Sequence, residues 1–220
     1  METPIPAYRA IDLETWPRRE HYNYYRQFLK CGYSLTARLD VPAAADFARR
    51  KGKRFYGCFL YAAARAVNSM DEMKMMSTPD GAPGVWETVH LNFTVFHEDD
   101  KTFSDLWTEY RPGFADFYRE WERVTAVYGA NHGVKGRPGQ PVNFFCISCV
   151  PWMDYTGYNT YTPGEPALFP IITFGKYTES AGRLTLPATV TIAHAAADGY
   201  HTARLFRRIQ EELDAFADME

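Results

Sequence analysis

Residues 190–201 read VTIAHAAADGYH, and this stretch holds the features that decide the fold. The β-branched and apolar residues of 184–194 predict a strand that ends at His194. Asp198-Gly199 then leads into a clear amphipathic helix over 200–217. The small alanines at 195–197 leave room for another group to approach this segment closely. A histidine at a strand end is well placed to face a cleft, and the alternative is a buried histidine that only satisfies its hydrogen bonds.

The rest of the chain alternates between segments with the helical period of about 3.6 residues and segments with the strand period of two residues. Helical spacing of apolar and aromatic residues predicts helices at 17–29, 43–50, 54–70 and 113–128. Alternating, β-branched and aromatic segments predict strands at 33–39, 88–97, 142–150 and 168–175. The Gly- and Pro-rich segment 131–141 predicts a loop. Interspersed helices and strands favour an α/β or α+β layer fold.

Composition limits the class of protein. The chain has 220 residues, 46% hydrophobic and 16% aromatic, which suits a single globular domain over 1–220. Lys and Arg total 24 and Asp and Glu total 27, so the formal charge is 24 − 27 = −3. Without a basic tract, nucleic-acid binding has no electrostatic basis. No apolar run approaches the roughly 20 residues of a membrane helix, and the N-terminus lacks the pattern of a secretory signal, so we expect a cytoplasmic protein.

Two cysteines in NFFCISCVPW (143–152) raise the question of redox or zinc chemistry. On a strand, Cys146, Ser148 and Val150 share one face, while Cys149 points to the other. The two thiols therefore diverge, and no second Cys pair or Cys/His cluster completes a zinc site. We expect free cysteines that pack as small core residues, and no metal. Ser148 lies in no G-x-S-x-G elbow, so by itself it is an ordinary strand hydroxyl.

The H-x-x-x-D-G motif after a strand resembles the active-site motif of chloramphenicol acetyltransferases, shared more loosely with the dihydrolipoamide acyltransferase catalytic domain. Further segments resemble the former family in order, over nearly the whole chain. They are 16–40, 53–68, 71–76 (DEMKMM), 89–107, 143–152, 169–177 and 194–206 (HAAADGYHTARLF). The resemblance implies a two-layer α/β (α+β) sandwich in which helices flank a mixed sheet.

The resemblance also implies a reaction, the transfer of an acetyl group from acetyl-CoA to a hydroxyl of an antibiotic, without a metal. It assigns His194 as the general base, for which a side-chain pKa of about 6.5 is suitable. Ser148 would stabilise the tetrahedral oxyanion, assisted by Thr173 through water. Asp198 and Arg18 would form an ion pair that holds the catalytic loop.

Family members form homotrimers with the active site between subunits. The resemblance implies that His194 comes from one subunit and that the neighbour supplies most of the acceptor pocket. The pocket residues would be Tyr25, Leu29, Cys31, Tyr33, Phe103, Asp105, Phe144 and Thr160. Residues near the CoA tunnel would be Arg54, Tyr56, Trp152, Lys176 and Tyr177. Core packing is the alternative role for each aromatic residue in these sets.

The sequence departs from the family pattern at four positions. Ala193 replaces the first of two adjacent histidines, while the catalytic one is retained. Asp105 stands in place of a small residue, Thr160 in place of a leucine and Tyr33 in place of a phenylalanine. These three changes add polarity, and a carboxylate in an apolar pocket needs a partner. The resemblance makes chloramphenicol the first candidate acceptor, and the added polarity makes a more polar hydroxyl compound the alternative.

Two other functions compete with this one. The first is acylation of a dihydrolipoamide-like thiol, which is disfavoured because no lipoyl or subunit-binding segment precedes the domain. The second is a non-catalytic homologue that binds a small molecule or a protein. The joint presence of His194, Ser148, Thr173 and the Arg18/Asp198 pair favours catalysis over such binding.

Overall fold

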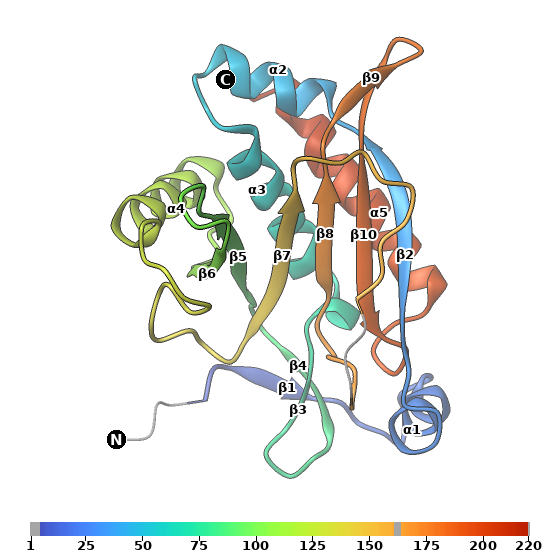
Figure 1. Cartoon of the computed structure of the whole chain (residues 1–220). Helices are drawn as coiled ribbons and strands as arrows, with labels where there is room; N and C mark the ends of the chain where they lie inside the picture. Colours follow the sequence, from blue (N-terminus) through green and yellow to red (C-terminus); the bar gives the residue numbers. More distant parts are fainter. Residues whose placement is uncertain (1–4, 161–163, 220) are drawn as a thin grey trace.

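A mixed sheet of seven strands forms the centre of the chain, whose computed structural model describes residues 5–160 and 164–219 (Figure 1). The strand order is β2-β10-β8-β7-β5-β6, and β9 pairs with β10. The pairs β5·β7 and β7·β8 are parallel and the others antiparallel. The strands span β2 Gly32–Asp40, β5 His90–Phe96, β6 Phe103–Thr108, β7 Phe144–Val150, β8 Ile171–Gly175, β9 Thr178–Ser180 and β10 Arg183–Ala193.

Helices cover one face of this sheet. The helices α3 and α5 lie against it, with α2 and α4 beside them, and α1 lies at the end where β2 begins (Figure 1). They span α1 Arg19–Gln27, α2 Pro42–Arg50, α3 Phe55–Asn68, α4 Phe114–Tyr128 and α5 Gly199–Asp214, with short 3₁₀ turns at Asp71–Met73 and Ala215–Ala217. A small antiparallel sheet has the order β1-β4-β3, from β1 Tyr8–Ala10, β4 Pro83–Trp86 and β3 Met75–Ser77.

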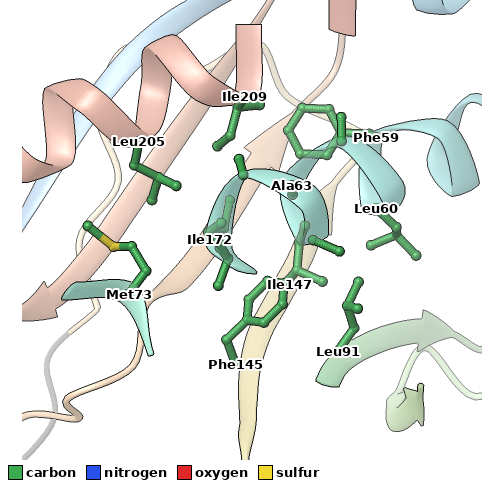
Figure 2. Packing of buried hydrophobic residues seen from close by; sticks show 14 of the residues in the cluster. Phe59, Leu60, Ala63, Met73, Leu91, Phe145, Ile147, Ile172, Leu205 and Ile209 are labelled. Atoms are coloured by element: carbon green, nitrogen blue, oxygen red, sulfur yellow. The ribbon is translucent and has the colours of Figure 1, made fainter. Parts of the chain in front are cut away.

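The core lies between the sheet and the helices. Figure 2 shows Phe59 and Ala63 of α3 packed against Ile147 and Ile172 of the sheet, with Ile209 of α5 beside them. All five side chains are at most 1% exposed. Burial of each large apolar side chain stabilises the fold by about 1.5–3 kcal/mol. This packing holds the strands in place and so fixes which residues point to the opposite face of the sheet.

Among the described residues no helix covers the other face of the sheet (Figure 1). The strand registers place several hydroxyl side chains on this face. One row crosses all six principal strands in register. From β6 to β2 it contains Asp105, Thr94, Ser148, Thr173, Thr189 and Thr36. Within it Thr36 and Thr189 are hydrogen-bonded at 2.7 Å, and Thr94 and Ser148 at 3.3 Å. We call it the hydroxyl row.

The predicted fold class is confirmed, and every helix and strand predicted from the sequence is present with ends shifted by a few residues. The strands β1, β3, β4, β6 and β9 were not predicted. Three of them have only three residues, too few to show a period, and their pairing depends on distant partners. Within the described part of the chain, no helix is long and apolar enough to cross a bilayer.

Candidate active site

His194 follows directly on β10 and is held in one orientation by two aromatic rings. Its backbone N–H donates to the carbonyl of Cys31 at 3.0 Å, which extends the β2·β10 ladder. The Tyr25 ring stacks on the imidazole with centroids 3.9 Å apart and planes 10° apart, and Tyr33 lies at 5.2 Å. Both tyrosines, expected in the acceptor pocket across from a neighbour's histidine, contact His194 of their own chain. The buried Nδ1 has no hydrogen-bond partner among the described residues, so this polar atom is available to a group outside them.

The expected ion pair between Arg18 and Asp198 is present. An Arg18 guanidinium nitrogen donates to Asp198 Oδ2 at 2.6 Å, and Asp198 is also the N-cap of α5. Burial alone would raise the pKa of Asp198, but the hydrogen bond from Arg18 and the nearby charges of His201 and Arg18 outweigh it and lower the pKa to about 2. A second Arg18 contact reaches the carbonyl of Ala195 at 3.5 Å. The pair thus ties the segment before α1 to the turn that follows His194.

His201 belongs to the same network, and the sequence analysis gave no indication of this role. Its Nδ1 lies 2.8 Å from Asp198 Oδ1, and it completes a capping box at the third position of α5. Its side chain is only 11% exposed and faces Glu72 at 3.5 Å. The D-x-x-H spacing at a helix start was the available signal, but capping boxes usually have Glu or Gln at this position.

Ser148 and Thr173 lie side by side in the hydroxyl row, far from His194 of the same chain. Ser148 pairs with Thr173, and Thr173 pairs with Thr189 of β10. His194 is five residues beyond Thr189, or roughly 16 Å along the strand, and Ser148 is two strand spacings, roughly 10 Å, to the side. Two side chains cannot bridge that separation, so His194 and Ser148 of one chain cannot act on one reacting carbon.

A cavity of about 570 Å³ lies where the start of α3 meets the ends of β5, β7 and β8. Four of the five residues predicted near CoA line it, namely Arg54, Tyr56, Lys176 and Tyr177. The fifth, Trp152, is 59% exposed and packs edge-on against Phe96 of the cavity wall. Thr94 also lines the cavity, and its hydroxyl contacts Ser148. The cavity therefore reaches the hydroxyl row.

The two cysteines of the strand β7, Cys146 and Cys149, are partly buried free thiols. Cys149 lines the 570 Å³ cavity, and burial raises the pKa of its thiol to about 12. Burial, with a smaller contribution from the charge of Asp105, raises the pKa of Cys146 to about 12 as well. Thiols with such pKa values are poor nucleophiles and poor metal ligands near neutral pH.

A second cavity, of about 250 Å³, lies between the start of β2 and residues 159–160 and 164–167. Of the predicted acceptor-pocket residues it contains Cys31, Tyr33 and Thr160. The other predicted residues lie elsewhere on this chain. Leu29 and Phe103 are 51% and 53% exposed, and Phe144 packs against Phe169 at 4.9 Å. Within one chain the predicted acceptor pocket is therefore only partly assembled.

Asp105 has a charged partner that the sequence did not reveal. Lys135 Nζ lies 3.1 Å from Asp105 Oδ2 and 3.4 Å from the Gln140 amide oxygen. Backbone hydrogen bonds from Asp105 to Val134 and from Gly136 to Asp105 hold the loop against β6. The partner lies 30 residues along the chain in a loop, where no periodicity predicts a contact. An ion pair, rather than an isolated carboxylate, therefore ends the hydroxyl row.

One group of side chains that could bind a metal ion had no signal in the sequence. His97, Asp99 and His132 place one nitrogen or oxygen each within 4.8 Å of one another. They come from the β5–β6 turn and from the 131–141 loop. Only the folded chain brings these segments together.

The two-layer sandwich, the oriented histidine after β10 and the cavity that reaches the hydroxyl row define an acyltransferase of the α/β sandwich type. The chain belongs to the chloramphenicol acetyltransferase family, whose model matches residues 6–210. A curated chloramphenicol acetyltransferase of Streptomyces acrimycini is 40% identical over 97% of both chains. Another, from Vibrio anguillarum, is 33% identical over 94% of this chain and 95% of the relative.

Solved structures agree on the fold. A chloramphenicol acetyltransferase has a TM-score of 0.83 at 24% identity, covering 94% of this chain and all of the other. A probable dihydrolipoamide acetyltransferase from Listeria monocytogenes has a TM-score of 0.62 at 11% identity, covering 100% of this chain and 97% of the other. Its lower score puts the chain nearer in shape to the former enzyme.

Proposed function

We propose that the protein transfers an acetyl group from acetyl-CoA to a hydroxyl of a small molecule, with chloramphenicol as the first candidate acceptor. The observation that carries the proposal is the fixed orientation of His194, whose imidazole is stacked on Tyr25 at the end of β10. The chloramphenicol acetyltransferases among the relatives supply the acceptor by analogy. Acting in the cytoplasm, this reaction would inactivate the antibiotic and give resistance to it.

His194 acts as the general base in this proposal. Its neutral imidazole takes the proton from the acceptor hydroxyl while that oxygen attacks the thioester carbonyl. The tetrahedral intermediate collapses, the carbon–sulfur bond breaks, and the CoA thiolate takes the proton back from the imidazolium. Ser148 donates a hydrogen bond to the oxyanion, and Thr173 assists through water. No covalent acyl-enzyme is required.

Because His194 and Ser148 of one chain are too far apart to share a reacting carbon, the proposed site combines two copies of the chain. His194 comes from one copy, and Ser148 with the hydroxyl row comes from the next. The partly assembled acceptor pocket of the single chain supports the same conclusion. A closed ring of three copies, as in the family, satisfies this head-to-tail arrangement.

Acetyl-CoA would occupy the 570 Å³ cavity. Arg54 and Lys176 in its wall supply cations for the CoA phosphates, and the aromatic wall suits the pantetheine arm and the adenine. Arg54 is held over the Trp121 ring at 4.3 Å. The thioester would then lie near Thr94 and Ser148, where the cavity meets the hydroxyl row.

A more polar hydroxyl acceptor is the second candidate, and the Asp105–Lys135 pair favours it. The Thr160 hydroxyl supports it too, since it lines the smaller cavity and is buried without a hydrogen-bond partner among the described residues. A substrate with several hydroxyl groups would form hydrogen bonds with these polar side chains, and chloramphenicol would form fewer of them.

The test measures release of free CoA from acetyl-CoA with chloramphenicol as acceptor. We compare the native chain with His194→Ala and with a matched control, His21→Ala, on the exposed surface of α1. Rapid release that His21→Ala keeps and His194→Ala loses supports the reaction and its base. Equal release by His194→Ala would exclude this base.

The acceptor is tested separately. If chloramphenicol gives no release above background, sugars and other polyols replace it as acceptors, and Asp105→Ser is compared with the native chain on both. A shift of preference toward chloramphenicol in Asp105→Ser supports the polar acceptor. No release with any acceptor would leave only a binding role.

A further inference from the structure

We infer that His97, Asp99 and His132 form a binding site for one divalent transition-metal ion of the Zn²⁺ type. The three side chains lie at the turn after β5, where the loop 131–141 crosses it. One ring nitrogen of each histidine and one oxygen of Asp99 lie within 4.8 Å of one another. The site is separate from the cavities described above, and none of its three residues lines them.

The hydrogen bonds decide which nitrogen of His97 is available. Ser104 Oγ lies 2.8 Å from the carbonyl oxygen of Asn131 and 2.8 Å from His97 Nε2. A carbonyl can only accept, so the single hydroxyl proton of Ser104 goes to Asn131. Ser104 must then accept from His97 Nε2–H. Neutral His97 therefore has its free lone pair on Nδ1.

The same reasoning applies to His132. Its Nδ1 lies 2.7 Å from Asp100 Oδ2, and the Asp100 carboxylate can only accept. In the neutral imidazole the proton is therefore on Nδ1 and the lone pair on Nε2, which lies 3.4 Å from Asp99 Oδ2. Each histidine thus uses one nitrogen as a donor to a fixed partner and keeps the other for an ion.

This arrangement is the one found around metal-bound histidines. A ligating imidazole almost always donates its second N–H to a carboxylate, carbonyl or similar group, which fixes the tautomer and raises its basicity. Here Asp100 and the Ser104–Asn131 pair already provide those contacts. Two imidazole nitrogens and one carboxylate oxygen suit Zn²⁺, Co²⁺ or Ni²⁺ rather than Mg²⁺ or Ca²⁺, with water completing the coordination.

One adjustment is needed for binding. The two imidazoles are stacked with centroids 4.1 Å apart and planes 19° apart, whereas a metal must lie near the plane of both rings. His97 is buried and stays fixed, so His132 has to turn. The side chains of His132 and Asp100 are both 44% exposed, so the two can move together and keep their hydrogen bond while His132 gives up its stacking on His97.

Binding would clamp the loop to the hairpin. His132 lies three residues before Lys135, which pairs with Asp105 of β6. The ion would therefore fix the segment that carries Lys135 against the strand that carries Asp105.

The test is Zn²⁺ binding by untagged protein that has been stripped with a chelator, measured by equilibrium dialysis and by titration calorimetry. The native chain should bind one ion per chain at this site. His132→Asn should weaken that binding at least tenfold because it removes a ligand. Asp100→Asn removes the carboxylate oxygen that faces His132 but keeps an amide oxygen for the two hydrogen bonds from Thr102, and about 10–100-fold weaker metal binding is expected. His21→Asn, the same change on the surface of α1, should bind like the native chain.

Co²⁺ separates this site from the cysteines. Bound Co²⁺ should show visible d–d absorption without the thiolate charge-transfer band of a cysteine site. Binding of no ion by the native chain, or equal affinity in the native chain and His132→Asn, would overturn the inference. A thiolate band that survives in His132→Asn would assign the ion to the cysteines and overturn it as well.

Discussion

Replacing Asp198 with asparagine removes the charge that Arg18 binds but keeps a side chain that can cap α5. Folding lowers the pKa of Asp198 from 3.8 to about 2. At about 1.4 kcal/mol for each pKa unit, this shift corresponds to roughly 2 kcal/mol of stability. The Asp198 side chain is 34% exposed, so solvent screening reduces the value. We expect Asp198→Asn to destabilise the protein by about 1–2 kcal/mol at pH 7.

Urea unfolding at fixed chain concentration measures this loss, because an oligomer's stability depends on concentration. Asp198→Ala should cost about 1 kcal/mol more, since it also removes the helix cap. A carboxyl whose pKa is lowered on folding stabilises the protein above its unfolded pKa of 3.8 and loses that contribution as the pH falls to about 2. The difference between the native chain and Asp198→Asn should therefore shrink over that range.

A double-mutant cycle with Arg18→Met assigns the loss to the pair. If Asp198→Asn and Arg18→Met have additive effects, or if Asp198→Asn unfolds at the same urea concentration as the native chain at pH 7, the ion pair does not stabilise the fold and the reasoning is refuted.

Three further predictions concern the site and its support. Ser148→Ala should lower kcat for acetyl transfer by about 10²–10³-fold with little change in KM for acetyl-CoA, measured by CoA release; an unchanged kcat would remove Ser148 from the oxyanion site. Gly57→Ala should lower the urea concentration at the unfolding midpoint, because the new Cβ would lie 2.5 Å from Trp121 and 2.7 Å from Tyr118. Such overpacking costs about 1–3 kcal/mol of stability, and the higher helix propensity of alanine offsets about 1 kcal/mol of it. Gly199→Ala, the same change at a helical glycine with open space around it, should not lower this midpoint, and an equal loss in both would refute the packing argument. Cys58, Cys146 and Cys149, whose pKa values burial raises to about 12, should resist iodoacetamide at pH 8 in the folded protein and react after unfolding; rapid labelling of Cys146 or Cys149 in the native state would reopen a redox role.

The sequence by itself determined the elements with a strong period and placed their ends within a few residues of those observed. The helical spacing of 200–217 and 54–70 predicted the helices α5 and α3. The motif around His194 predicted the Arg18–Asp198 pair across 180 residues, although only through resemblance to a family. Local periodicity cannot supply a contact of that range.

Tertiary structure alone decided which distant groups meet. The hydroxyl row exists because six strands pair in one register, and that register also separates Ser148 from His194. Lys135 reaches Asp105, and His132 stacks on His97, because a loop without periodicity folds back on the β5–β6 hairpin. Strand register and loop path depend on packing over the whole chain, whereas helix and strand periods depend on a few neighbouring residues. The chain therefore encodes its elements locally and its site only when folded.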